Sequence, residues 1–145
     1  MNIFIPLIVF TTLICSKPVI GAPSPHPEGV MLCHGIADIV GRIKQQRQTG
    51  KSESDNDGLE ILRQLEREVK QDLITPVDAF LANTERLPAR WSAALFTHAC
   101  LYNYTGNLAQ VALMSTLISQ RCDLKHTGIA CIDKIFTTLP QQTAI

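Results

Sequence analysis

The chain has 145 residues, and its 13 Lys and Arg balance its 13 Asp and Glu, so the formal net charge is zero. This balance excludes the basic footprint expected of a nucleic-acid-binding protein and the polybasic patch expected of a membrane-surface protein. We therefore expect neither nucleic acid nor a lipid surface as the partner.

The first residues predict secretion. Residues 3–15 form an apolar run that is shorter than the roughly 20 residues needed to cross a bilayer, and its length is typical of a signal peptide. Val19 and Gly21 stand at the −3 and −1 positions before Ala22, so we expect residues 1–21 to be removed. The alternative is a single membrane anchor, because this stretch has no Lys or Arg before the apolar run. We expect a secreted, extracellular domain of residues 22–145, with no membrane insertion after cleavage.

The cysteines agree with an oxidising compartment. Of the five, Cys15 lies in the expected signal peptide, which leaves Cys33, Cys100, Cys122 and Cys131. We expect two disulfides, each stabilising the fold by roughly 2–4 kcal/mol. Four cysteines allow three pairings, and the sequence does not choose among them.

The first helices follow from apolar spacing. After a Pro-rich arm, one helical stripe predicts a helix over residues 29–48, with Arg42, Lys44 and Arg47 off that stripe. A polar loop spans residues 49–57. Asp57 is expected to cap a second helix, which Thr75-Pro76 ends. The same pair, with Thr75 as N-cap, is expected to begin a short helix over residues 76–83. The two apolar stripes are Leu32, Ile36, Ile39, Val40 and Ile43, then Leu59, Leu62, Leu65, Val69 and Leu73.

Three helices are expected in the second half of the chain. Ser92 is expected to cap a helix that runs to Tyr104, and a break at residues 105–107 makes Asn107 the next N-cap. Residues 108–118 are apolar on nearly every side, which predicts a central, buried helix that ends at residues 121–122. Thr127 is expected to cap a last helix that Pro140 ends. Convincing strand alternation is missing from the sequence, so the predicted fold class is all-α.

The sequence contains no convincing catalytic or metal-binding constellation. Its Cys and His residues have irregular spacings for zinc, and it has no Gly-x-Ser-x-Gly motif or free Cys with a plausible base. We therefore expect no enzyme activity, no cofactor and no metal. Asn103-Tyr104-Thr105 is a sequon for N-linked glycosylation, which would require Asn103 to face solvent.

The sum of these features resembles the short-chain four-helix cytokines of class I, of the interleukin-2/interleukin-4 or granulocyte–macrophage colony-stimulating factor/interleukin-3 type. The resemblance lies in residues 101–131 and in the closing segment Ile129-Ala130-Cys131-Ile132-Asp133-Lys134-Ile135-Phe136-Thr137-Thr138-Leu139. The loop of residues 49–57 is short for the long first crossover of that fold, and the link between Cys122 and Cys131 is shorter still, so an extra short helix is expected to fill the gap.

The resemblance implies a disulfide-stapled four-helix bundle that binds cell-surface class I cytokine receptor chains and triggers signalling. Its receptor contacts would lie on the first and last helices, at Glu28, Asp38, Arg42, Asp133 and Lys134. Oligomeric state is left open. The alternative is a secreted helical ligand carrier or defence protein, and a carrier would enclose an apolar cavity lined by Leu113, Phe96 and Phe136.

Overall fold

The computed structural model describes residues 27–126 and 128–138, and within them every regular element is a helix. The all-α class is therefore confirmed. The expected signal peptide, Thr127 and Pro140 lie outside the described residues. The elements, in chain order, are α1 (Pro27–Gln48), the 3-10 helix η1 (Glu53–Asp55), α2 (Asp57–Val69), α3 (Ile74–Asn83), α4 (Ala89–Leu101), α5 (Leu108–Arg121) and α6 (Ala130–Thr138).

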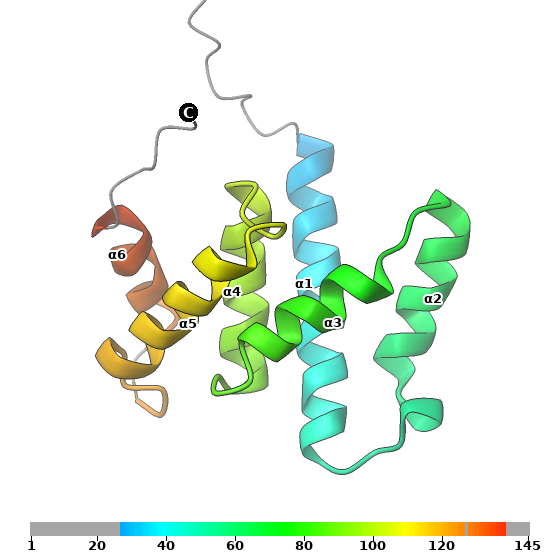
Figure 1. Ribbon diagram of the computed structural model, residues 1–145, viewed down its shortest axis with the longest axis horizontal. Helices are drawn as coiled ribbons and strands as arrows, with labels where there is room; N and C mark the ends of the chain where they lie inside the picture. Colours follow the sequence, from blue (N-terminus) through cyan, green and yellow to red (C-terminus); the bar gives the residue numbers. More distant parts are fainter. Residues whose placement is uncertain (1–26, 127, 139–145) are drawn as a thin grey trace, which may run out of the picture.

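Four helices stand in a row and two cross in front of them. In Figure 1, α6, α4, α1 and α2 stand side by side, and α3 and α5 run across their near side. The most extensive contact is between α1 and α4, followed by α1 with α2. The expected four-helix bundle is not confirmed by this arrangement, in which α3 and α5 cross the row. Among the described residues, no helix combines the length and apolar character needed to cross a membrane.

The core lies between the row and the two crossing helices. Its most buried large side chains come from six helices, so that every α-helix contributes to one cluster. Phe80 of α3 meets Phe96 of α4 edge to face, with ring centroids 5.0 Å apart. Burying an aromatic side chain of this size stabilises the fold by roughly 1.5–3 kcal/mol. Representative members are Val40, Leu62, Phe80, Leu95, Val111, Ile118 and Ile132.

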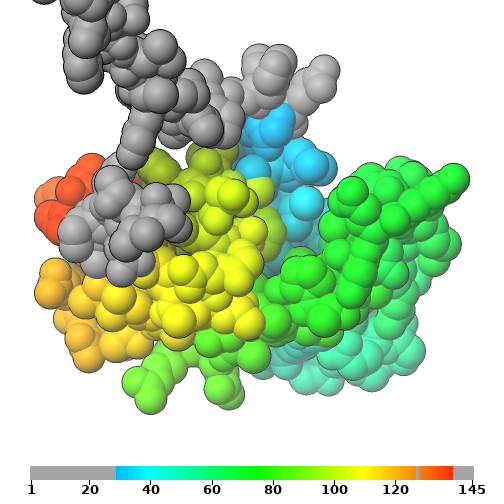
Figure 2. Space-filling view, turned by 45° about the horizontal axis from the view of Figure 1, so that its top comes forward, coloured from blue at the N-terminus to red at the C-terminus, as the bar shows by residue number. Residues whose placement is uncertain are grey.

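The first helix is buried on a narrower stripe than its sequence predicts. Val40 and Ile43 are fully buried. In the first turns of α1, Leu32 is 53% exposed, whereas its neighbour Cys33 is buried and joined by a disulfide to Cys100 of α4. Figure 2 shows these turns, in blue, between the green segment of α2 and the yellow segment that joins α4 to α5. The predicted end of this helix at Gln48 is confirmed.

The N-cap of α2 is Asn56, not Asp57 as predicted. The Asn56 side chain accepts a hydrogen bond from the Leu59 N–H (3.2 Å) and donates one to the Ile43 carbonyl (3.2 Å). A carboxylate could accept the first bond but could not donate the second. The amide therefore caps α2 and ties it to α1 at the same time.

The predicted boundary between α2 and α3 is also wrong. The second helix ends at Val69, where Lys70 adopts a left-handed conformation (φ 54°), rather than at Thr75-Pro76. The Glu66 carboxylate accepts hydrogen bonds from the N–H groups of Leu73 (3.0 Å) and Ile74 (3.2 Å). Because Glu66 reaches across the turn in this way, α3 begins at Ile74 and Thr75 is not its N-cap.

The fourth helix begins three residues before its predicted cap. It starts at Ala89, so Ser92 lies inside the helix and is buried, and it ends at Leu101 rather than Tyr104. The predicted break is confirmed. Asn107 caps α5 by accepting the Gln110 N–H (3.1 Å).

The fifth helix is not the central, buried helix that its composition predicts. Its buried residues, Val111, Met114, Ser115 and Ile118, share one face. Leu113 is 47% exposed on the other side. The reason is tertiary: α5 crosses the outside of the helical row (Figure 1), so only one of its faces meets other helices.

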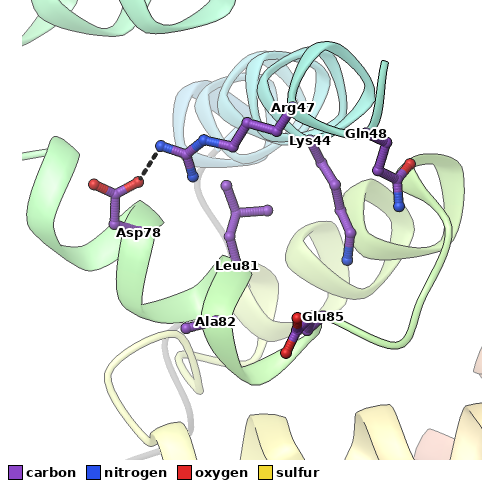
Figure 3. A pocket seen from close by; sticks show the side chains of 7 residues that line it. All are labelled: Lys44, Arg47, Gln48, Asp78, Leu81, Ala82 and Glu85. Carbon is purple, nitrogen blue, oxygen red and sulfur yellow. Dashed lines mark hydrogen bonds and ion pairs between the residues drawn. The ribbon is translucent and has the colours of Figure 1, made fainter. Parts of the chain in front are cut away.

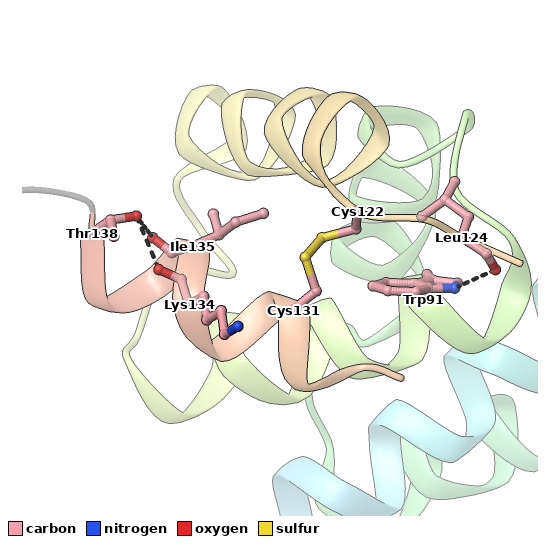
Figure 4. Close-up of a disulfide and its surroundings, with 7 residues drawn as sticks. All are labelled: Trp91, Cys122, Leu124, Cys131, Lys134, Ile135 and Thr138. Carbon is pink, nitrogen blue, oxygen red and sulfur yellow. Dashed lines mark hydrogen bonds between the residues drawn. A yellow bond between two sulfur atoms is a disulfide. The ribbon is translucent and has the colours of Figure 1, made fainter. Parts of the chain in front are cut away.

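Two disulfides are present, as predicted, and the structure selects their pairing. Cys33–Cys100 joins α1 to α4 across 67 residues of sequence. Cys122–Cys131 closes a separation of only 9 residues and joins the end of α5 to α6 (Figure 4). Beside this second disulfide, the Trp91 indole N–H donates to the Leu124 carbonyl (3.1 Å), which ties α4 to the α5–α6 connection.

Candidate functional site

A groove runs along the side of α1 and α4, and no residue of α3 or α5 lines it. Its floor is made of small residues, because the two helices approach closely there. A Cβ atom added to Gly41 would lie 3.1 Å from the Ala93 Cβ, which is tighter than an ordinary van der Waals contact. Small side chains on both helices therefore leave a strip of surface that a partner can approach. The small residues are Ala37, Gly41, Ala89, Ala93 and Ala94.

Charged side chains of α1 follow one edge of the groove. His34, Asp38 and Arg42 line it and are exposed. Residues four apart lie on the same face of a helix, so these three form a single row. Arg90 of α4 lies on the opposite edge and is also exposed. Two of the predicted receptor-contact residues, Asp38 and Arg42, are thus brought together on one surface.

His98 of α4 and Ile129, the residue before α6, also line the groove. The His98 ring bonds through Nδ1 to the Ala94 carbonyl (2.9 Å) and through Nε2 to the Asp133 carboxylate (2.6 Å). Both partners are oxygen atoms that accept hydrogen bonds, one from the backbone of α4 and one from the side chain of α6. The same ring packs on Phe136, with centroids 4.9 Å apart. These contacts bring Asp133 of the last helix beside a residue that lines the α1–α4 groove.

The other predicted contact residues are placed differently. Lys134 is exposed on α6 but does not line the groove. Glu28 belongs to the first turn of α1, and its side chain lies outside the described part of the chain. Of the five predicted residues, Asp38 and Arg42 line the groove, and Asp133 does not line it but contacts the lining residue His98.

A second, smaller pocket lies at the C-terminal end of α1, around Lys44 (Figure 3). The Lys44 ammonium donates hydrogen bonds to the Thr84 carbonyl and to the Ser92 hydroxyl (2.8 Å). The side chain is only 6% exposed, and this burial lowers the pKa of Lys44 to about 8, against the raising influence of Glu85. Burial disfavours the charged form because an ammonium group loses its hydration.

Next to Lys44, Arg47 is bound by two carboxylates. Its Nη2 lies 2.9 Å from Asp78 Oδ1, as Figure 3 shows, and its Nε lies 2.8 Å from Glu53 Oε1. The hydrogen bonds that Arg47 donates to the Glu53 carboxylate are the main reason that the pKa of Arg47 is raised. Lys44 and Arg47 therefore bind groups of the same chain. Their contacts hold the end of α1 against α3 and against the connection between α3 and α4. We interpret the pocket as structural.

Sequence reasoning missed Lys44 because it placed this residue off the apolar stripe. A usable signal was present: Lys44 follows Ile43 directly and lies four residues after Val40, so it borders the buried face. Ser92 was missed in the same way, as a cap rather than as the buried acceptor of the Lys44 hydrogen bond.

Two further features bear on the other hypotheses. The described residues contain no group of three His, Cys, Asp or Glu side chains that could hold a metal ion, and the four cysteines among them are all in disulfides. The three residues expected to line a carrier cavity lie in different surroundings. Phe96 is buried against Phe80, Leu113 is exposed, and Phe136 packs on His98.

Comparisons with known proteins give no relative: scans of protein-family models, of curated proteins and of solved structures each found no match. Functional inference for this chain therefore depends on its own residues.

Proposed function

We propose that the chain is a secreted cytokine-like ligand, related in fold to the short-chain four-helix bundles, that binds class I cytokine receptor chains and triggers signalling. The observation that supports this most directly is the groove between α1 and α4. One row of exposed side chains, His34, Asp38 and Arg42, borders a strip of small residues that the other helices leave open.

The chemistry of this surface suits recognition of another protein. Exposed charges of both signs steer a partner of complementary charge and select against partners with the opposite pattern. The floor of small residues allows a helix or loop of the partner to approach the backbone of α1 and α4. Asp133, which contacts the groove residue His98, adds a charged group from the last helix.

The disulfides support the compartment that this function requires. Disulfides form and persist in oxidising surroundings, which include the outside of the cell. Both pairs join helices, so they stabilise the scaffold that presents the groove.

The test is a binding screen of the purified chain against class I cytokine receptor ectodomains. We expect one receptor chain to bind with nanomolar affinity. The charge reversals Asp38→Lys and Arg42→Glu are expected to weaken this binding tenfold or more each, because reversal replaces attraction by repulsion at the contact.

Matched controls come from α2. Glu68→Lys and Arg67→Glu reverse exposed charges outside the groove and should leave the affinity unchanged. If no ectodomain binds, the receptor-ligand proposal is wrong. If the α2 reversals weaken binding as much as the α1 reversals do, the receptor exists but the groove is not its binding site. Uptake of an apolar fluorescent ligand by the purified chain would favour the carrier instead.

A further inference from the structure

The turn between α4 and α5 presents one asparagine in an unusual setting. Asn103 is exposed and adopts a left-handed conformation (φ 59°) just beyond the end of α4. The turn is held by its backbone: the Asn103 N–H donates to the Cys100 carbonyl (3.1 Å) and the Tyr104 N–H to the Ala99 carbonyl (2.6 Å). The Asn103 carboxamide makes no hydrogen bond with any described residue, so its nitrogen is accessible.

The other described asparagines use their carboxamides inside the fold. Asn56 caps α2, Asn83 donates to the Ala79 carbonyl (2.8 Å), and Asn107 caps α5. Asn103 is also the asparagine that a Thr follows two positions later, with Tyr104 between them. Sequence motif and free carboxamide therefore coincide at one residue.

An apolar patch borders this turn. The Tyr102 side chain is 51% exposed, and its ring stacks on Tyr104 (6.3 Å between centroids) and on Phe136 of α6 (5.5 Å). Leu108, at the start of α5, is also exposed. An exposed apolar patch favours association between molecules unless something covers it.

We propose that Asn103 carries an N-linked oligosaccharide and that this oligosaccharide covers the Tyr102 patch. In the transfer, the Asn103 carboxamide nitrogen forms a bond to C1 of the first sugar of a lipid-linked oligosaccharyl pyrophosphate. The bond from that C1 to the pyrophosphate oxygen breaks, the lipid pyrophosphate leaves, and the amide gives up one proton. A eukaryotic secretory pathway supplies this donor and the transferase, in the same compartment that forms disulfides.

This modification does not depend on a receptor, so it can be tested apart from the proposed function. The full chain is expressed in a eukaryotic cell line and recovered from both cells and medium, then treated with peptide N-glycosidase. We expect the enzyme to increase the electrophoretic mobility of the wild-type chain. An unchanged mobility in both fractions overturns the proposal.

Two variant pairs separate glycosylation from folding. Thr105→Ser keeps the sequon and should keep the mobility shift, whereas Thr105→Ala removes both. Asn103→Gly removes the acceptor while glycine keeps the left-handed backbone conformation without strain. A shift that persists in Thr105→Ala or in Asn103→Gly places the oligosaccharide elsewhere and overturns the assignment to Asn103.

A separate measurement tests whether the oligosaccharide covers the Tyr102 patch. Binding of a fluorescent apolar dye should be higher for Asn103→Gly than for the glycosylated wild type. In the Asn103→Gly background, Tyr102→Ser should return dye binding toward the wild-type level, because it removes the exposed ring. Equal dye binding with and without the oligosaccharide shows that it does not cover the patch.

Discussion

The α1–α4 pair and the α5–α6 pair are both joined by a disulfide, yet they are built differently. The disulfide of the α1–α4 pair joins residues that are 67 positions apart in the sequence. Small side chains pack closely between these two helices, and the polar side chain of Lys44 is buried near the C-terminal end of α1. The second pair closes 9 residues and leaves apolar side chains such as Leu113 exposed.

The difference shows how the two contacts are specified. Helices that are distant in sequence have many possible packing partners. The contact between α1 and α4 is made specific by closely packed small residues and by the hydrogen bond from Lys44 to Ser92. Helices that follow one another along the chain are already neighbours, so α5 and α6 need less specific contacts. Four predictions can break or sharpen this comparison.

The largest effect is expected from the disulfides. Chain-entropy arguments give about 4 kcal/mol for the 67-residue separation and about 2.5 kcal/mol for the 9-residue one. The double variant Cys33→Ala/Cys100→Ala should therefore lose more stability in urea unfolding than Cys122→Ala/Cys131→Ala. Both pairs are treated identically, so each serves as the control of the other. Equal losses of unfolding free energy would show that sequence separation does not determine how much each disulfide stabilises the fold.

The next effect concerns the two faces of α5. Ile118→Ala removes a fully buried side chain and should cost about 2–5 kcal/mol of unfolding free energy. Leu113→Ala, on the same helix, should cost less than about 0.5 kcal/mol because the side chain is exposed. Thermal unfolding of both variants measures the contrast. Similar losses would indicate that α5 is buried all round, as its composition predicts.

Alkaline pH tests the buried lysine of the α1–α4 pair. The pKa of Lys44 is about 8 in the folded chain, against 10.5 ordinarily, so between these values the unfolded chain binds the proton that the folded chain has released. Stability then rises with pH across this window, by up to about 3 kcal/mol from this group. Urea unfolding at several pH values should show the rise in wild type and its loss in Lys44→Met.

Lys51→Met is the matched control for this measurement, since Lys51 is exposed in the loop after α1. It should follow the wild-type curve. A Lys44→Met curve parallel to wild type from pH 8 to 10.5 would refute the buried-lysine interpretation.

The smallest effect distinguishes two glycines. A Cβ at Gly58 would lie 2.7 Å from Ile43 Cγ1 and 2.9 Å from the Ile43 backbone nitrogen, so Gly58→Ala should destabilise the chain by about 1–3 kcal/mol. Gly35 has open space around the same position, and Gly35→Ala should stabilise α1 by about 0.5–1 kcal/mol. Melting temperatures that move in the same direction for both would contradict the close approach of α2 to α1.

Local signals in the sequence predicted much of the helical framework. The ends at Gln48, Asn83 and Arg121 and the cap at Asn107 depend on residues within one helical turn, and all are confirmed. The wrong boundaries depend on groups farther away. Glu66 sets the start of α3 from eight residues upstream, and Asn56 displaces Asp57 as a cap because it also bonds to α1.

The site was less predictable because it depends on tertiary contacts. The row of Asp38 and Arg42 follows from helical spacing, but only the folded chain brings Asp133 to His98 across 35 residues. Which side of α5 is buried, and which polar residue of α1 is buried, depend on how helices cross. Periodicity along one helix carries no information on that crossing.

The Cys33–Cys100 bond also decides what a protease can release. Lys51 lies in the exposed loop after α1, and a cut there divides the chain between the two cysteines. The two fragments remain one covalent molecule until the disulfide is reduced. On a gel without reductant the nicked protein would migrate as a single species, and α1, with its half of the groove, would stay attached to α4.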